Sequence, residues 1–440
     1  MSLWNQTPEA LRLAMLDTGI RRAWIVTLPG TREVRASHPL FEPIAAAVQA
    51  DTRDYHAHQG VFFEIGAASG HLLSAAVHKT VRGQAAGGVR LWVYDEVQAF
   101  VRDGLRLARG MGHKNALAGL WWGGGKGVVA RRADVDHTDP AVRRALYHDY
   151  GRFMTGIRGC YVTAEDAGTT TEDMADVFAT TRHTTCIPEH LGGSGNPSRL
   201  TATGVVVGME AALHFRGMGD LRGKTVAMQG LGNVARFMIR DLVERGAGRI
   251  VGTDVDARAI ELTRAMNPDA PLEARLVPIG DASVLAEPSD IVAPNAVGGI
   301  LNARTIPTIQ APIVCGAANN QLEDHEADGP ALRDRGVLYA PDFLVNRMGI
   351  VNCANECYGS FEGDPAILSH LDHASEHGIF QRSLAVYRRA HLSGRTPAAE
   401  AQTMADELSD VAHPIWGNRG QLIIDSLVST GWAEQQPLQP

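Results

Sequence analysis

The chain has 440 residues, of which 45% are hydrophobic, so it is long enough for two or three domains with large cores, and a disordered or fibrous protein is excluded. The net charge of −8 and the lack of a Lys/Arg-rich block argue against nucleic acid and favour small-molecule partners. Five cysteines without a CxxC pair, and no segment typical of a signal peptide or membrane span, predict free thiols in a cytoplasmic protein without membrane contact.

Residues 1–55 show no clear pattern, and the segment after them predicts a small sheet. VFFEI and HLLSAAVHKTV, joined by the turn GAASG, predict a hairpin. A second turn, GQAAGG, leads to a third strand over VRLWVY. Apolar residues then recur at helical spacing from Val97 to Met111, which predicts an amphipathic helix with Lys114 near its end.

Two lysines twelve positions apart are the first candidates for a functional site. Lys126 follows Gly123–Gly125, which we expect to form a turn that lets a small substrate approach the backbone. Two cations in one small pocket suit an anionic ligand, and each lowers the pKa of the other, which makes a lysine a base near neutral pH. The alternative is a glycine-rich turn with two solvated lysines.

A carboxylate is the third candidate. After a predicted helix over 139–156, the run YVTAEDAGTTTEDMADV predicts a short strand over 161–163 and a helix that begins at Thr171, with Asp166 between them. A carboxylate at a strand end that faces a pocket can exchange protons with a substrate. The alternative is that Asp166 caps the entry of the helix.

The segment GGSGNPSRL, 192–200, is typical of a linker, and the pattern changes after it. A helix over about 201–215 precedes a strand, a glycine turn, a helix and a second strand. GLGNVA fits the GxGxxG/A fingerprint, whose glycines let the backbone approach a pyrophosphate at a helix N-terminus. Asp254 ends the second strand, where it would bind the ribose hydroxyls and repel a 2′-phosphate, so we predict NAD rather than NADP. A doubly wound domain that binds no nucleotide is the alternative.

Further strands are predicted at 290–296 and 311–320. Asn295, Asn319 and Asn320 fall at their C-terminal ends, where open α/β sheets place ligands. A last strand, VLYAPDFLVN, is expected to run to Asn346, and helices fill most of 351–431. The predicted fold class is therefore α/β.

Nine motifs follow one another in the chain: AAGGVRLW, GMGHKN, GGGKG, TAEDAGTTTEDM, SGNPSRLTATGV, QGLGNVA, APNAVGGILN, GAANNQL and YAPDFLVN. In this order, over about residues 55–430, they resemble the glutamate/leucine/phenylalanine/valine dehydrogenase superfamily, most nearly its leucine and phenylalanine branch. The resemblance implies a catalytic α/β domain with a mixed sheet (1–195, completed by mostly helical 350–440) and a Rossmann domain (196–349). It also implies reversible NAD-dependent oxidative deamination of an L-amino acid to a 2-oxo acid and ammonia, and we expect a homo-oligomer.

The resemblance implies a role for individual residues. Lys126 and Asp166 match the catalytic lysine and aspartate, and Lys114 matches the lysine that binds the substrate α-carboxylate. Lys126 would activate water for attack on an imino-acid intermediate, while Asp166 relays protons to and from the amine. The other predicted substrate-binding residues are Ala86, Gly87, Gly88, Met111, Ala164, Asn319, Ile350 and Cys353. The predicted cofactor-binding residues are Thr201, Gly230, Gly232, Asn233, Val234, Asp254, Asn295 and Asn320, and no metal site is predicted.

Some positions depart from the family pattern. Leucine and phenylalanine relatives have Asn-Ala-Gly-Gly where this chain has Asn-Arg-Met-Gly at 346–349, which places a cation, Arg347, near the expected pocket. Trp121 and Trp122 are either core residues or a pocket wall, and residues 1–55, without a close counterpart, are expected to serve assembly. Two other functions stay open: a nucleotide-binding homologue with altered or lost dehydrogenase chemistry, and a dehydrogenase for a polar or acidic amino acid recognised through Arg347.

Ala86 predicts the side chain of the substrate. Glutamate-specific relatives have a lysine at this position, which pairs with the distal carboxylate, whereas this chain has a methyl group. A buried carboxylate without a partner is strongly destabilised, so glutamate is expected to be a poor substrate. The resemblance implies a large apolar L-amino acid, aromatic or branched aliphatic, with phenylalanine or tryptophan ahead of valine.

Overall fold

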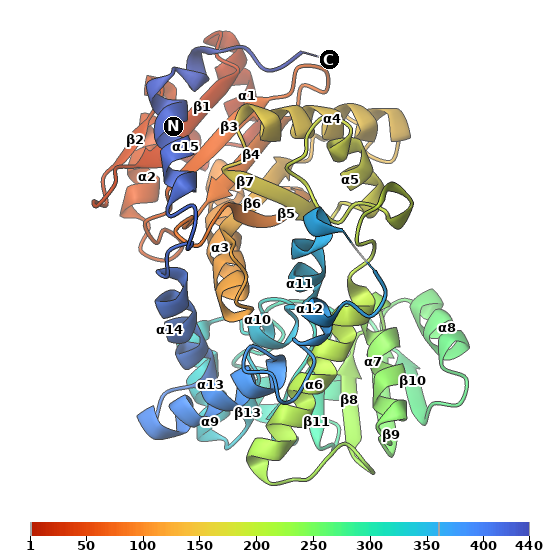
Figure 1. Ribbon diagram of the computed structural model, residues 1–440. Coiled ribbons are helices and arrows are strands. Elements are labelled where there is room, and N and C mark those ends of the chain that lie inside the picture. Colours follow the sequence, from red (N-terminus) through yellow and green to blue (C-terminus); the bar gives the residue numbers. More distant parts are fainter. Residues whose placement is uncertain (1, 360, 440) are drawn as a thin grey trace.

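The computed structural model describes residues 2–359 and 361–439, which fold around two sheets. Figure 1 shows the first sheet above the second. In these residues the first sheet has seven strands in the order β2-β1-β3-β4-β6-β5-β7. The second has six, in the order β10-β9-β8-β11-β12-β13. The predicted α/β class, with one mixed and one parallel sheet, is confirmed.

The first sheet is mixed. Its strands are β1 (Arg22–Thr27), β2 (Val34–Ala36), β3 (Gly60–Ile65), β4 (Leu72–Val77), β5 (Ala85–Trp92), β6 (Gly123–Ala130) and β7 (Tyr161–Glu165). The β3–β4 pair is antiparallel, which confirms the predicted hairpin. β5 lies between β6 and β7 and runs parallel to both, so the carboxyl end of β7 lies beside β5 and one strand away from β6.

Two stretches predicted as turns are strands instead. Ala85–Gly88 belongs to β5, and Gly123–Gly125 begins β6. A Cβ atom added to either of the first two glycines of β6 would overlap a backbone carbonyl oxygen, that of Lys79 or that of Ala108. The glycines are therefore needed because neighbouring backbone lies too close for a side chain, and the chain turns earlier, at 118–122.

Helices cover both faces of the first sheet. They are α1 (Pro8–Asp17), α2 (Glu42–Ala50), α3 (Val97–Leu117), α4 (Pro140–Gly156) and α5 (Thr171–Phe178). The first three pack into one core and the last two into the core on the opposite face. Helix α4 confirms the predicted 139–156 helix and begins at Pro140 after an Asp139 cap, a common entry because the first helical N–H has no partner to lose. Residues 1–55 add two strands and two helices to this unit.

The second sheet is parallel throughout. Its strands are β8 (Thr225–Gln229), β9 (Arg249–Asp254), β10 (Leu272–Leu276), β11 (Ile291–Pro294), β12 (Ile313–Val314) and β13 (Leu338–Tyr339). Its helices are α6 (Ser198–Arg216), α7 (Asn233–Glu244), α8 (Ala257–Met266) and α9 (His325–Asp334). The chain starts at central β8, moves out to β10, and returns to β11 on the other side, which is the Rossmann order.

The predictions for the end of this sheet were partly wrong. β13 stops at Tyr339, and the short helix α10 (Asp342–Val345) follows where a strand was expected to continue to Asn346. Pro341 lies between them, and a proline has no N–H to extend a β-ladder. Asn319 and Asn320 lie in the loop after β12, several residues beyond its end.

The C-terminal helices divide between the two cores. They are α11 (Met348–Ala354), α12 (Pro365–Leu368), α13 (Ile379–Ser393), α14 (Pro397–Ser409) and α15 (Arg419–Ser429). Helices α13 and α14 pack into the core that contains α6, whereas α15 packs against the first sheet. The short 3-10 helices are η1 (Leu3–Asn5), η2 (Pro39–Phe41), η3 (Glu189–Leu191), η4 (Ser283–Ala286), η5 (Ile306–Thr308), η6 (Glu356–Tyr358) and η7 (Trp432–Glu434). Among the described residues, no helix combines the length and the apolarity needed to cross a membrane.

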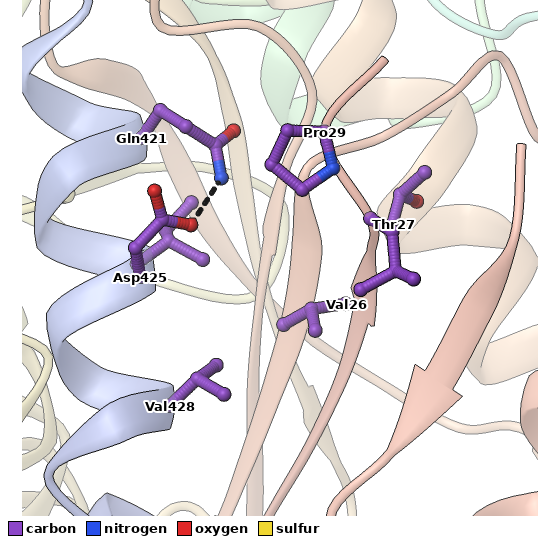
Figure 2. Close-up of a pocket in the computed structure, with 8 residues that line it drawn as sticks. Val26, Thr27, Pro29, Gln421, Asp425 and Val428 are labelled. Carbon is purple, nitrogen blue, oxygen red and sulfur yellow. Dashed lines mark hydrogen bonds between the residues drawn. The ribbon is translucent and has the colours of Figure 1, made fainter. Parts of the chain in front are cut away.

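A groove of about 220 Å³ lies between α15 and the end of β1. Figure 2 shows Gln421, Asp425 and Val428 of α15 facing Val26 and Pro29 across it. Within the described part of the chain, none of the predicted site residues lines this groove. Apart from Asn319, the predicted substrate and catalytic residues lie instead on or next to strands of the first sheet and on α3 and α11.

Candidate active site

The first sheet brings Lys126 and Asp166 into contact. Lys126 lies in β6, only 2% exposed, and its Nζ is 2.8 Å from Oδ1 of Asp166, which directly follows β7. The strand between them is β5, and a Cβ added to its Gly88 would overlap the Cβ of Asp166. Gly88 therefore lets Asp166 lie over β5 toward Lys126. A Cβ on Gly87 would similarly come within 2.9 Å of Met111 on α3.

A chain of charges continues from Asp166. Its second carboxylate oxygen accepts a hydrogen bond of 2.9 Å from Nε of Arg90, which in turn pairs with Asp103 at 3.0 Å. The hydroxyl of Tyr94 donates to Asp103 at 2.7 Å. Sequence reasoning missed Arg90 and Asp103, although Arg90 follows the Gly-Gly pair in the same motif.

The pKa of Asp166 follows from these neighbours. Burial alone would raise it, but the cations of Lys126 and Arg90 outweigh burial and hold the pKa well below its usual range. The carboxylate is thus charged at neutral pH. The alternative role as a helix cap is wrong, because α5 is capped by Thr170, whose side chain forms a reciprocal capping box with Asp173.

Both lysines have lowered pKa values, as the sequence predicts. Burial is the main cause for each, and it brings the pKa of Lys114 to about 8, with a further contribution from the charge of Lys126. Lys114 is not among the main influences on the pKa of Lys126, however; the cation that lowers the pKa of Lys126 is Arg90. The alternative of two solvated lysines is wrong for Lys126, which is buried, and Lys114 is half-buried.

Lys114, on α3, contacts the loop that follows β12 of the second sheet. Its Nζ donates to Oδ1 of Asn319 at 3.3 Å, and Asn319 also accepts a hydrogen bond of 2.9 Å from Asn346. Asn346 donates to the carbonyl of Ala317 as well, and its own side-chain oxygen is buried without a partner among the described residues. Asn346 is therefore a further candidate for the site, which the sequence indicated only as the end of a strand and the neighbour of Arg347.

The remaining predicted substrate residues are apolar and buried. Ala86 lies on β5 and Ala164 on β7, whereas Ile350 and Cys353 lie on α11. Their exposed fractions run from 1% for Ala86 to 7% for Ile350. Ala164 and Cys353 belong to one core cluster, so two elements far apart in sequence meet there.

Arg347 does not join this site. Its side chain is 0% exposed, and its guanidinium donates to the backbone carbonyls of Leu117 and His377. The two carbonyls take the terminal nitrogens, and Nε is buried without a partner among the described residues. Because the whole side chain is buried away from the site, the alternative of an acidic substrate recognised through Arg347 loses its support. Trp121 is not a core residue, because it is 42% exposed; Arg82 stacks on its ring at 4.6 Å.

The glycine turn after β8 has the form that a pyrophosphate needs. Gly230 has a φ of +96°, and a Cβ there would overlap Ala296. Gly232 caps α7 and has nothing within 4 Å of an added Cβ, so the approach to the helix is open. Asn233 and Val234 begin α7, whose first N–H groups receive no side-chain cap from Gly232 and can bind an anion.

Asp254 ends β9 beside this turn, as predicted. Its carboxylate accepts hydrogen bonds from the N–H of Leu231 at 2.7 Å and of Asp256 at 2.9 Å, so it also holds the glycine turn in place. Each oxygen keeps a second lone pair for a ribose hydroxyl. The hydrogen bonds by which Asp254 holds the glycine turn were not predicted from the sequence.

The other three predicted cofactor residues lie on separate elements. Asn295 follows β11, and its Nδ2 is buried without a partner in the part of the chain that the structure describes. Thr201 lies on α6 and faces Gly349, whereas Asn320 has a φ of +54° and donates its N–H to Asp342. The unsatisfied amide of Asn295 is the group among these that still needs a partner.

Comparisons with known proteins agree with this arrangement. Two family models match the chain: Glu/Leu/Phe/Val dehydrogenase, dimerisation domain, over 69–183, and Glutamate/Leucine/Phenylalanine/Valine dehydrogenase over 192–405. The leucine dehydrogenase of Geobacillus stearothermophilus is 40% identical over 70% of this chain and 80% of its own length. The valine dehydrogenase of Streptomyces coelicolor is 38% identical over 82% and 94%.

A solved structure is similar as well. The L-tryptophan dehydrogenase of Nostoc punctiforme superposes with a TM-score of 0.65 and 31% identity over 80% of this chain and 96% of that one. Dehydrogenases of this family depend on NAD or NADP. Since the family models and the relatives at about 40% identity cover most of its length, the chain belongs to the glutamate/leucine/phenylalanine/valine dehydrogenase family and is an amino acid dehydrogenase.

Proposed function

We propose that this protein oxidatively deaminates a large apolar L-amino acid to its 2-oxo acid and ammonia, reversibly, with NAD as the hydride acceptor. The observation that carries the proposal is the buried contact of 2.8 Å between Lys126 and Asp166, with Lys114 close enough for its pKa to be lowered by Lys126. The names of the leucine, valine and tryptophan dehydrogenases that resemble the chain support an apolar substrate.

Each charged side chain has a distinct task in this mechanism. Lys114 binds the substrate α-carboxylate, assisted by the bare backbone at Gly87 and Gly88. NAD, when bound, accepts the hydride from the α-carbon. Lys126, uncharged more readily because burial lowers its pKa, removes a proton from the water that attacks the imino carbon, and Asp166 passes protons to and from the departing amine. Asn319 lies beside Lys114 and orients the amine.

We propose that Gly230, Gly232, Asn233 and Val234 hold the pyrophosphate of NAD and that Asp254 holds the adenosine ribose. The open position at Gly232 and the uncapped N–H groups of α7 support the fit. Thr201, Asn295 and Asn320 are assigned to the nicotinamide end, where the unpaired amide of Asn295 would donate a hydrogen bond.

Removing the charge of Asp254 is expected to weaken the preference for NAD. Asp254→Asn keeps an oxygen for the N–H of Leu231 but no longer repels a 2′-phosphate, so the ratio of kcat/KM for NAD over NADP should fall about tenfold, which corresponds to about 1.4 kcal/mol. Asp254→Ala serves as the comparison, because it also removes the hydrogen bond that holds the turn. A wild-type protein that reduces NADP faster than NAD at equal concentration would show that the role of Asp254 is misassigned.

The substrate preference is expected to depend on Ala86. Among phenylalanine, tryptophan, leucine, valine and glutamate, kcat/KM should be highest for the aromatic substrates and lowest for glutamate, because Ala86 has a methyl group where glutamate-specific relatives have the lysine that pairs with the distal carboxylate. Ala86→Leu fills space in the pocket and should shift the preference toward smaller aliphatic side chains. Ala86→Val, with an unchanged melting temperature, is the milder control, and a clear preference of the wild type for glutamate would refute the assignment.

We propose the domain division that the sequence predicts, with a catalytic unit of 1–195 and 350–440 around a Rossmann unit of 196–349. The packing of α15 against the first sheet supports this return of the chain, whereas α13 and α14 pack into the core that contains α6 and do not support it. We also propose a homo-oligomer formed through the region matched by the dimerisation model, with residues 1–55 contributing to assembly. Five free thiols support a cytoplasmic location.

A further inference from the structure

Two cysteines from distant parts of the chain meet beside the substrate residues. The Sγ atoms of Cys186 and Cys353 are 2.7 Å apart, although 167 positions separate the residues in sequence. This distance is only about 0.7 Å longer than a disulfide bond. Both side chains are buried, with exposed fractions of 4% and 2%.

The backbone on both sides of the pair is held by hydrogen bonds. Thr185 donates its hydroxyl to the carbonyl of Cys353 at 2.9 Å. The carboxylate of Glu356 accepts hydrogen bonds from the N–H of Cys186 at 2.7 Å and from the N–H of Ile187 at 2.9 Å. The close approach of the two sulfurs is therefore a property of two anchored segments.

The conformation of Cys186 is a second, independent observation. Its φ is +61°, in the left-handed region where a side chain is disfavoured by about 1 kcal/mol and glycine is the usual residue. A glycine at this position would relieve the strain but would remove the thiol that faces Cys353. The chain thus carries a cysteine where the backbone alone favours glycine.

The pair lies where the two halves of the molecule join. Met348 and Val351 of α11 pack into the core around the second sheet, whereas Cys353 at its other end packs with Cys186 and Ala164 into the core of the first sheet. Figure 1 shows α11 between the two sheets. Cys186 also precedes the linker to α6, so a covalent bond here would tie α11 to the first unit beside the linker.

We propose that Cys186 and Cys353 form a reversible disulfide when the protein meets hydrogen peroxide, and that the disulfide slows turnover by tying α11 to the first unit and reshaping the apolar wall at Cys353. One thiol gives up its proton as its sulfur attacks a peroxide oxygen; the O–O bond breaks, the departing hydroxide takes the proton, and a sulfenic acid and one water result. The second thiol attacks that sulfur and releases another water, so two thiols and one peroxide yield one disulfide and two waters. A small oxidant suits a pair that is almost completely buried.

The reduced form is the resting state. The hydrogen bond with Cys353 and burial together raise the pKa of Cys186 well above its usual value, so the Cys186 thiol stays protonated at neutral pH. A thiol reductant that reaches the disulfide restores this state by thiol–disulfide exchange. Because a protonated thiol reacts slowly with oxidants, the pair stays reduced until peroxide is supplied.

The test uses the full-length protein, treated with hydrogen peroxide, alkylated with iodoacetamide and digested without reduction. Mass spectrometry should find a linked peptide pair that contains Cys186 and Cys353, and the free thiols should fall from five to three, since two are consumed. Turnover should drop about fivefold or more and recover with dithiothreitol. Absence of the linked pair, or a linked pair with unchanged turnover, would overturn the proposal.

Variants separate this disulfide from other oxidation. Cys186→Gly suits the positive φ, should keep the basal activity, and should make turnover resistant to peroxide. Cys357→Ser removes the exposed thiol nearby and should leave the sensitivity intact. Equal sensitivity of Cys186→Gly and wild type would contradict the proposal, and Cys353→Ala tests the linkage if the glycine variant fails to fold. The activity readout rests on the proposed function, but the linked peptide does not, so a protein that turns over no amino acid would refute that function alone.

Discussion

Replacement of Lys126 by alanine is expected to abolish turnover while NAD binding stays largely intact. The ammonium lies in the first sheet against Asp166, whereas the glycine turn and Asp254 lie in the second, so the substitution removes the base without touching the dinucleotide residues. Loss of a positioned base reduces kcat by about 10²- to 10⁴-fold. Steady-state kinetics with the best apolar substrate and a titration with NADH measure the two effects.

The pH profile of the wild type provides a further check on Lys126. A base acts only when unprotonated, so kcat/KM for deamination should rise as pH increases through the pKa of Lys126, which burial places below that of an ordinary lysine. Lys114→Ala is the contrast variant, because it should raise KM at least about tenfold through loss of a charge-assisted hydrogen bond to the carboxylate. Near-normal turnover of the Lys126→Ala protein would refute the assignment of Lys126 as the catalytic base.

Gly124→Ala is expected to destabilise the fold and to impair substrate binding together. An added Cβ would overlap the carbonyl oxygen of Ala108 and lie 2.8 Å from the backbone nitrogen of Gly112, so either α3 or β6 has to move. Overpacking of this kind costs about 1–3 kcal/mol. Because Lys114 follows Gly112 on the same helix, a shift of α3 also displaces the proposed carboxylate ligand and should raise KM.

Gly110→Ala is the matched control for this variant. Gly110 lies on the same helix, an added Cβ there meets nothing within 4 Å, and alanine favours a helix over glycine by about 1 kcal/mol. Its melting temperature should equal or exceed that of the wild type, while that of Gly124→Ala should fall. Equal melting temperatures for the two variants would show that β6 and α3 can separate without cost.

The sequence by itself determined the elements whose signals are local. The apolar spacing before Lys114 predicted α3, and Asp139-Pro140 marks the start of α4, because helical periodicity and capping depend on residues within a turn of one another. The turn GLGNVA and Asp254 likewise predicted the strand, turn, helix and strand of the Rossmann unit. The candidate residues Lys114, Lys126 and Asp166 came from the order of their motifs.

Only the tertiary structure decided what depends on contacts through space. Gly123–Gly125 lie in a strand that pairs with β4 and β5, and backbone oxygens at the first two positions and the ring of Tyr161 at the third leave no room for a Cβ. A local pattern of glycines cannot distinguish such a strand from a turn. Arg347 was a possible substrate ligand in the sequence, but its buried guanidinium donates to the carbonyls of Leu117 and His377 instead. Arg90 beside Asp166 and Cys186 beside Cys353 are contacts between residues that neither periodicity nor motif spacing brings together, because sheet order and helix packing set them.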